Sequence, residues 1–356
     1  MEKDFTTQTN EAIELLATLI KTPSISRKET DAADVLASFM EAHNIPFHRD
    51  GNNLWAIGKT YEKERPTLLL NAHLDTVKPA EGWTHPPFVP TREGDRLYGL
   101  GSNDCGGGLV SLLQVFRILS SRPQPYNLVY AASCEEEVSG KNGFEHLLPL
   151  LPPIQVAIVG EPTQMQPAIA EKGLMVLDVT VRGKAGHAAR KEGVNAIYKA
   201  IDDINWFRTY QFPKVSPLLG EVKMTVTIVH AGEQHNVVPD LCTFTVDVRS
   251  NECYKNQEIL DEIGKKINSE VKARSTRLGS SHIDKEHPII QRAIALGRIP
   301  FGSPTLSDQA LMPFASFKMG PGNSARSHTA DEYIETSEIA EAIQLYIALL
   351  DGLSIE

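Results

Sequence analysis

Acidic and histidine side chains follow directly after three short apolar segments of the sequence. TLLLNA (67–72) precedes His73 and Asp75, NLVYAAS (127–133) precedes the acidic run 135–137, and QVAIVG (155–160) precedes Glu161. Short uninterrupted apolar runs are typical of strands buried on both faces of a sheet. Because ligands of open α/β sheets bind beyond the carboxyl ends of the strands, we expect these side chains to converge on one crevice.

Two further residues complete a set whose chemistry suits divalent metal ions. Asp104 stands just before the glycine run 106–108, and His328 lies in the polar segment GPGNSARSHTADE (320–332). Carboxylate oxygens mixed with imidazole nitrogens suit zinc, cobalt or manganese. Because five protein ligands are enough for two ions only if one carboxylate bridges both, the set predicts a two-metal site. The four cysteines form no CxxC pair, which argues against zinc held by thiolates.

The elements that must position these residues read as a mostly parallel α/β sheet. The three apolar runs alternate with amphipathic stretches at 11–20, 32–42 and 109–119, whose apolar residues recur three and four positions apart. Strands that alternate with helices are typical of parallel sheets. The same pattern returns after about residue 281, with a closing helix predicted over 337–350.

A different pattern occupies the middle of the chain. LMVLDVTVR (174–182) alternates apolar and polar residues strictly, as do MTVTIVH (224–230) and CTFTVDVR (242–249). Such alternation is typical of strands with one face exposed. We therefore predict a discontinuous catalytic domain formed by 1–173 and 282–356, with an α+β domain inserted at 174–281.

Length, composition and charge exclude several classes of protein. The chain has 356 residues, 41% of them hydrophobic and 22% charged, and a net charge of −10. No basic run is present, so a nucleic-acid partner is not expected. The N-terminus is acidic and polar, and no apolar segment reaches membrane-spanning length, so we expect a cytoplasmic protein without a membrane partner.

The motifs together resemble the zinc-dependent M20 family of aminoacylases and carboxypeptidases. The resemblance runs over nearly the whole chain. It is carried by NAHLDTV (71–77), YGLGSNDCGGG (98–108), SCEEEVSG (133–140), VGEPT (159–163), GKAGHAA (183–189), NVVPD (236–240) and GPGNSARSHTADEYI (320–334). It implies an amide hydrolase with two divalent ions, expected to be zinc, with cobalt or manganese as alternatives.

The resemblance also implies a role for each member of the set. Asp104 would be the bridging carboxylate, with His73 and Glu161 on one ion and Glu137 and His328 on the other. Glu136 would be the general base. Asp75 would accept the second N–H of the His73 ring and so fix its tautomer.

The implied mechanism uses Glu136 for both proton transfers. It would take a proton from the attacking water and then pass it to the departing amine. His187, supplied in the family by the inserted domain of a neighbouring subunit, would stabilise the oxyanion, which implies a homodimer. Arg249 and Asn236 would bind the substrate carboxylate, and we extend this role to Lys172.

The expected substrate is an N-acyl amino acid, most closely N-acetylornithine or N-acetylcitrulline, as in arginine biosynthesis. Within the same fold, the alternatives are a desuccinylase acting on succinyl-diaminopimelate or on succinylated ornithine or citrulline, and a dipeptidase or carboxypeptidase. A non-catalytic ligand-binding relative is the alternative from another class. Such proteins usually lose a ligand or the base, whereas all six positions are filled in this chain.

Two positions depart from the family pattern. Cys105 and Gly106 follow the bridging aspartate, where a Lys or Met-Lys is usual. The acidic run reads Glu-Glu-Glu where Asp-Glu-Glu is commoner, so the base and ligand assigned to Glu136 and Glu137 could shift by one residue.

Overall fold

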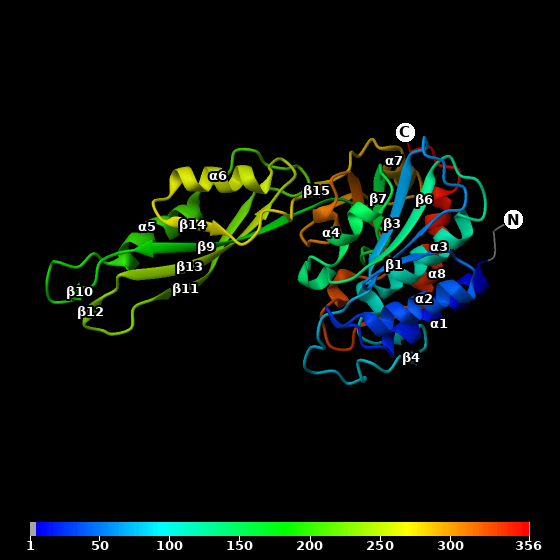
Figure 1. Cartoon of the computed structure of the whole chain (residues 1–356), viewed down its shortest axis with the longest axis horizontal. Helices are drawn as coiled ribbons and strands as arrows, with labels where there is room; N and C mark the ends of the chain where they lie inside the picture. The colour runs from blue at the N-terminus through cyan, green and yellow to red at the C-terminus, as the bar shows by residue number, and fades with distance from the viewer. Residues whose placement is uncertain (1–4, 356) are drawn as a thin grey trace. The chain divides into compact units, whose positions relative to one another are not determined.

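The computed structural model describes residues 5–355, which form two compact units (Figure 1). Unit 1 comprises the chain through Ile169, His282–Phe301 and the chain from Ser307 onward. Unit 2 comprises Ala170–Ser281 and Gly302–Leu306. Across the described part of the chain, no helix is both long enough and apolar enough to cross a bilayer.

The central sheet of unit 1 is parallel at its middle. Its order is β1-β2-β6-β3-β7-β17-β8-β15, with β16 paired to β8. Strands β6, β3, β7 and β17 pair in parallel, whereas β1–β2 and β2–β6 are antiparallel. The strands are β1 (His48–Asp50), β2 (Asn53–Ile57), β3 (Thr67–His73), β6 (Asn127–Ser133), β7 (Val156–Val159), β8 (Ala168–Glu171), β15 (Ser281–His282), β16 (Phe301–Ser303) and β17 (Ala315–Lys318). The predicted mostly parallel α/β sheet is confirmed.

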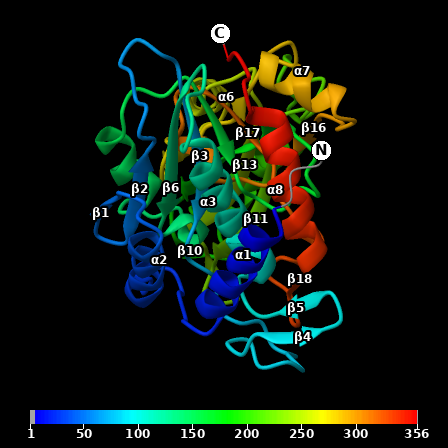
Figure 2. The same ribbon diagram turned by 90° about the vertical axis from the view of Figure 1, so that its right-hand side faces the viewer.

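The central strands are apolar throughout because both faces of the sheet are covered. Leu68 and Leu70 of β3 belong to the main core, whereas Leu69 belongs to a smaller core on the opposite face. Figure 2 shows helices α1, α3 and α8 on one side of this sheet. The helices of unit 1 are α1 (Thr6–Ile20), α2 (Thr30–Ala42), α3 (Gly107–Leu119), α4 (Phe144–Leu147), α7 (Pro288–Ala295) and α8 (Thr336–Leu350).

A small antiparallel sheet and several short helical turns complete unit 1. The sheet has the order β18-β5-β4 and comprises β4 (Thr91–Glu93), β5 (Arg96–Tyr98) and β18 (Tyr333–Glu335). The turns are η1 (Ser102–Gly106), η2 (Glu136–Val138), η3 (Leu148–Leu150), η4 (Asp308–Leu311) and η5 (Ser324–Arg326). Turns η1 and η2 directly follow Gly101 and Glu135, which both adopt a positive φ.

Unit 2 is an antiparallel sheet with its own core. The order is β11-β13-β9-β14, and β9 buries every second residue from Met175 to Val181, as its alternating sequence predicts. Helices α5 (Ala196–Thr209) and α6 (Asn256–Lys266) contribute Phe207, Ile259 and Ile263 to the same core. The strands are β9 (Gly173–Arg182), β11 (Lys223–Ala231), β13 (Leu241–Ser250) and β14 (Glu270–Ala273), and a separate pair is formed by β10 (Gly186–His187) and β12 (Val237–Val238).

Glycine is required where helix α3 begins. A Cβ atom on Gly108 would overlap the backbone carbonyl oxygen of Gly160, which follows β7. This close approach joins the loop that carries Asp104 to the strand end that carries Glu161. A backbone neighbour cannot move aside as a flexible side chain can, so no side chain fits at this position.

We expect Gly108→Ala to lower the free energy of unfolding by about 3 kcal/mol or more, because the added methyl group forces two backbone segments apart. Gly264→Ala is the matched control, since Gly264 lies in α6 and a Cβ added there would meet no atom within 4 Å. There the gain in helix propensity should stabilise the chain by roughly 0.5–1 kcal/mol. Urea unfolding followed by circular dichroism measures both changes. If Gly108→Ala and Gly264→Ala had equal free energies of unfolding, the packing argument would be contradicted.

Candidate metal centre

His73 ends strand β3 with its ring buried and its Nε2 atom turned towards carboxylates. Its Nδ1 atom lies 2.9 Å from the backbone oxygen of Asp75. A carbonyl oxygen only accepts hydrogen bonds, so Nδ1 carries a proton, and Nε2 offers a lone pair once the ring is deprotonated for metal binding. Nε2 lies 3.3 Å from Oδ1 of Asp104 and 3.6 Å from Oε1 of Glu161. The ring is therefore set to bind a cation between these groups.

Asp104 faces a histidine with each of its two carboxylate oxygens. Oδ1 is the atom nearest His73, and Oδ2 lies 3.5 Å from Nε2 of His328. His328 Nε2 also lies 3.0 Å from Oε2 of Glu137. All five predicted ligands thus lie together in unit 1, with Asp104 between the two sets.

The donor atoms are spaced as ligands of a small divalent ion would be. Two ligand atoms at tetrahedral positions, each 2.0–2.1 Å from zinc, lie about 3.3 Å apart. The separations of 3.3, 3.6, 3.5 and 3.0 Å scatter around that value. Oε1 of Glu161 is moreover buried and receives no hydrogen bond from the described residues. The residues therefore fit a pair of divalent cations.

The charges at this centre also favour cations. Burial and the neighbouring Asp104 raise the pKa of Glu161 to about 8. Burial raises the pKa of Glu136 well above its usual range. Burial disfavours ionised Asp104 as well, yet hydrogen bonding and charge from the His73 ring bring the pKa of that carboxyl below its usual value. The pKa of His73 is itself raised well above its usual value, so without a metal the ring is protonated and its Nε2–H faces Asp104. Divalent ions would relieve the repulsion among these groups and keep them ionised.

Asp75 lies beside the His73 ring, and its carboxylate accepts hydrogen bonds from other groups. Its Oδ1 atom is 3.7 Å from Nδ1 of His73, which instead pairs with the backbone oxygen. The carboxylate accepts the N–H groups of Glu136 at 2.9 Å and Glu137 at 3.2 Å, and the hydroxyl of Ser26 at 2.7 Å. These three donors hold the Asp75 carboxylate against the acidic turn, while His73 donates its Nδ1–H to the Asp75 backbone oxygen.

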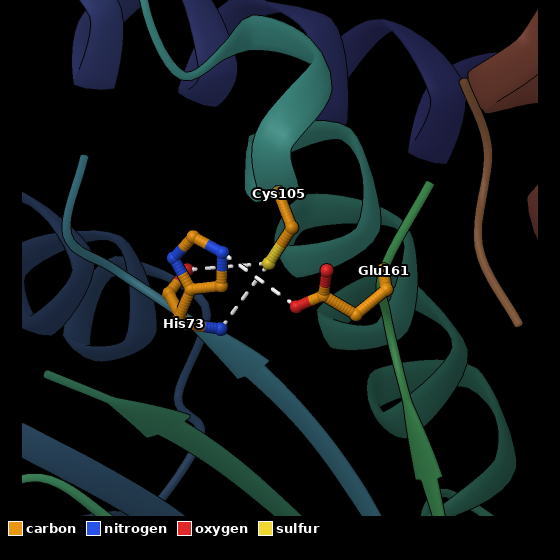
Figure 3. Close-up of side chains that lie close together, drawn as sticks. All are labelled: His73, Cys105 and Glu161. Atoms are coloured by element: carbon orange, nitrogen blue, oxygen red, sulfur yellow. Dashed lines mark hydrogen bonds and ion pairs between the residues drawn. The ribbon is translucent and has the colours of Figure 1, made fainter. Parts of the chain in front are cut away.

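Cys105 lies behind His73 and is fixed by the backbone (Figure 3). Its Sγ atom accepts the His73 N–H at 3.2 Å and lies 3.6 Å from the His73 carbonyl oxygen. The thiol could join His73 and Glu161 as a third donor. However, burial raises the pKa of Cys105 to about 12, so the neutral thiol is favoured. Its preceding peptide bond, from Asp104, is cis.

Two predicted residues of unit 2 lie side by side in the β10–β12 pair. His187 pairs with Val237 in register, and the backbone oxygen of the adjacent Asn236 accepts the N–H of Ala188 at 3.0 Å. Both side chains are exposed. Nδ1 of His187 accepts the N–H of Ala189 at 3.1 Å, so its proton is on Nε2 in the neutral ring. His187 therefore presents an N–H donor to solvent.

The two predicted cations of unit 2 already have partners. Nε and Nη2 of Arg249 donate to the two carboxylate oxygens of Asp247 at 2.8 and 3.2 Å, although the sequence suggests a guanidinium free to reach a substrate. The two residues are two positions apart on β13, so their side chains share a face. Lys172 Nζ donates to the backbone oxygen of Glu221 at 2.9 Å.

Two buried carboxylates near the ligands are absent from the sequence-based set. Asp308 accepts the side-chain amide of Asn71 at 3.0 Å and the hydroxyl of Ser133, at the ends of β3 and β6, and burial raises its pKa to about 6. Glu332 accepts backbone N–H groups around Asp104, and burial and the Asp104 charge raise its pKa to about 8. Proximity to His328 in sequence could have singled out Glu332; for Asp308 we find no comparable signal.

A family model described as peptidase family M20/M25/M40 matches residues 69–352. The chain belongs to this family. It is 27% identical to an acetylornithine deacetylase of Shigella sonnei strain Ss046, over 95% of this chain and 96% of that protein. It is 28% identical to an acetylornithine deacetylase of Proteus mirabilis strain HI4320, over 96% of each.

Solved structures share the fold at lower identity. The aminopeptidase PepT of Bacillus cereus ATCC 10987 has a TM-score of 0.78 at 17% identity, covering 96% of this chain and 98% of its own. A dinuclear metal-binding M20 peptidase of Bacillus subtilis has a TM-score of 0.73 at 16% identity, covering 97% and 98%. Family membership confirms the resemblance seen in the motifs and identifies the chain as a metal-dependent amide hydrolase.

Metal content tests the two donor sets. We expect about two divalent ions per wild-type chain after dialysis, about one in His328→Ala, and neither at high affinity in Asp104→Ala, because Asp104 serves both sets. Plasma mass spectrometry on folded, monodisperse protein measures these values. If Asp104→Ala retained both ions, the prediction that Asp104 bridges the two ion sites would be contradicted.

Proposed function

We propose that the protein hydrolyses the amide bond of an N-acyl amino acid, with N-acetylornithine or N-acetylcitrulline as substrate. One observation carries the chemistry: a single carboxylate, Asp104, separates two histidine–glutamate pairs, with Glu136 adjacent to Glu137. The nearly full-length similarity to acetylornithine deacetylases supports the choice of substrate. The metals are proposed to be zinc, with cobalt or manganese as alternatives.

The ligand set is His73, Asp104 and Glu161 for one ion, and Asp104, Glu137 and His328 for the other. Bound there, the ions would supply Lewis acidity, which makes the attacking water more acidic and polarises the acyl carbonyl. The protein's own part is to hold the ligands: Asp75 fixes the turn that carries Glu137, and the Asp75 backbone oxygen orients His73.

Glu136 is the proposed general base. Its backbone is held by Asp75, and burial, which raises its pKa, makes its carboxylate a stronger base than an exposed glutamate. It takes a proton from the water as the new C–O bond forms. It then gives that proton to the nitrogen as the C–N bond breaks, so one side chain completes both transfers.

Residues of unit 2 are proposed to bind the substrate. His187 offers an exposed N–H that suits a developing oxyanion. Asn236 and Arg249 would hold the substrate carboxylate. Arg249 would release the carboxylate of Asp247 and bind that of the substrate instead. Lys172 is a further candidate, and burial lowers the pKa of its amine.

Two other substrate classes remain alternatives within the same chemistry. A desuccinylase would need an additional cation for the distal carboxylate of the acyl group. The structural likeness to an aminopeptidase and to a M20 metallo-carboxypeptidase of Sulfolobus solfataricus, with TM-scores of 0.78 and 0.73, motivates testing dipeptides as well.

A substrate panel tests the proposal directly. We expect release of free amine from acetylornithine or acetylcitrulline, little from succinyl analogues or dipeptides, and no activity after complete chelation. Glu136→Gln should keep its metals but lose up to about 10,000-fold in kcat, since proton transfer depends on this carboxylate. Turnover of dipeptides alone would reject the deacylase, and activity without metal would reject the mechanism.

We further propose that unit 2 forms a homodimer through β11 and α5. Strand β11 is an end strand of its sheet and exposes Ile228 and Val229 at 45% and 51%. Helix α5, which packs beside it, exposes Tyr198 and Ile201 at 71% and 54%. An uncovered apolar face next to an open strand edge suits a second copy of the same surface.

Charge introduced on this face should separate the subunits. We expect Tyr198→Glu combined with Ile201→Glu to convert a dimer into a monomer in light scattering coupled to size exclusion, because like charges cannot pair with each other when the interface buries them. Ile299→Lys is the control, since Ile299 is 73% exposed and lies in unit 1. A wild-type protein that is monomeric at all concentrations would contradict the proposal.

A further inference from the structure

Glu332 is a buried carboxylate that binds backbone donors rather than a ligand. It is 2% exposed and precedes strand β18. Its Oε1 atom accepts the N–H groups of Asn103 at 2.8 Å and Asp104 at 2.9 Å, and its Oε2 atom accepts that of Gly101 at 3.0 Å. The carboxylate therefore fixes the backbone at the start of η1, including the amide of Asp104 itself.

The same side chain joins two segments that are far apart in sequence. Glu332 follows His328 by four residues, and its hydrogen bond to Asp104 spans 228 residues. The backbone N–H of Gly99 also donates to the Glu332 carbonyl oxygen at 2.9 Å. The segment that carries His328 is thus tied on both sides to the loop that carries Asp104.

Asn103 makes a second connection between these segments. Its Oδ1 atom accepts the N–H of Asn323 at 2.9 Å. Its amide donates to the Asn323 carbonyl oxygen at 3.1 Å and to the Ser327 hydroxyl at 3.2 Å. Gly322 has a φ of 85°, and a Cβ there would overlap the Asn103 amide oxygen, so the close approach requires glycine. Ser327 directly precedes His328.

No apolar or shorter side chain could replace Glu332 without loss. Three buried N–H groups point at its two oxygens, and only a carboxylate offers acceptors on both sides of its terminal carbon. Glutamine keeps the shape but presents an NH₂ group on one side, which would face another N–H donor. The arrangement stabilises one position of the Asp104 backbone at the electrostatic cost of a second buried carboxylate beside it.

We infer that Glu332, assisted by Asn103, is a positioning residue that fixes the shared carboxylate of Asp104 relative to His328, so that both ion sites are formed before metal binds. This inference rests on the proposed ligand set. When the hydrogen bonds that support a metal ligand are removed, the ligand becomes mobile. The metal must then order the ligand as it binds, which lowers the metal affinity. Loss of Glu332 should therefore weaken both ion sites, whereas loss of His328 should affect one.

The test is metal affinity in chelator-treated protein that remains folded. We titrate the wild type, Glu332→Gln, Glu332→Ala and Asn103→Ala with zinc by calorimetry, and with cobalt while recording its visible spectrum. The wild type should bind about two ions, and the Glu332 variants should bind both with about 10–100-fold lower affinity. Because Glu332→Gln retains two of the three acceptor contacts, its loss should be smaller than that of Glu332→Ala.

Asp203→Asn is the matched control. Asp203 is a buried carboxylate of unit 2, 5% exposed, that accepts the N–H of Asn268 and the hydroxyl of Ser269. The substitution Asp203→Asn should lower the unfolding midpoint of the metal-free protein without changing its metal affinity. The control separates a positioning function of Glu332 from a general contribution to folding. If Glu332 contributed only to folding, Glu332→Gln would behave like Asp203→Asn, with a lower unfolding midpoint and unchanged metal affinity.

The outcomes distinguish the inference from the proposed function. A wild type that binds neither zinc nor cobalt rejects the ligand set itself. If the wild type binds both ions and folded Glu332→Gln binds them with equal affinity, only the positioning function of Glu332 is rejected. If neither Glu332 variant folds, Asn103→Ala decides, because native affinity in that variant contradicts the same inference.

Discussion

The structure of unit 1 depends on a dense cluster of carboxylates at one edge of a buried sheet. Asp104, Glu137 and Glu161 lie within ion-pair distance of two histidines, His73 and His328, and Glu136 and Asp308 are close enough to add to the repulsion. Buried like charges of this density are unstable unless cations neutralise them. The site is therefore costly for the apo protein and becomes favourable when divalent ions bind.

The ligands of such a site need rigid support from the residues around them. Three buried carboxylates give this support, and their hydrogen-bond donors are backbone N–H groups and uncharged side chains. Asp75 binds the N–H groups of the acidic turn, Glu332 binds those of the Asp104 loop, and Asp308 joins Asn71 of β3 to Ser133 of β6. Each is a carboxylate that receives several donors, so its own charge is spread over fixed dipoles.

The sequence predicts the parts of this protein that depend on periodicity and on strand ends. Apolar runs such as TLLLNA locate the central strands, and strand parallelism then brings His73, Glu137 and Glu161 to one edge. Hydrogen-bond partners are less predictable, because they depend on loop backbone directions that no side-chain pattern encodes. The partner of the His73 ring, the pairing of Arg249 with Asp247 and the contacts of Glu332 all belong to this second class.

The same distinction explains why the chemistry of the chain is easier to infer than its substrate. The catalytic ligands are fixed by residue type, since only certain atoms bind metal ions. The proposed substrate binding would instead depend on exchange of partners at Arg249, whose guanidinium already holds the Asp247 carboxylate in a two-oxygen contact. Under the proposed function, a substrate carboxylate would replace Asp247 with little net change in charge pairing, so Coulomb attraction would contribute little to selectivity. Selectivity must then arise from the shape of the acyl and amine groups that accompany the carboxylate, and these leave no signature as compact as a metal-binding motif.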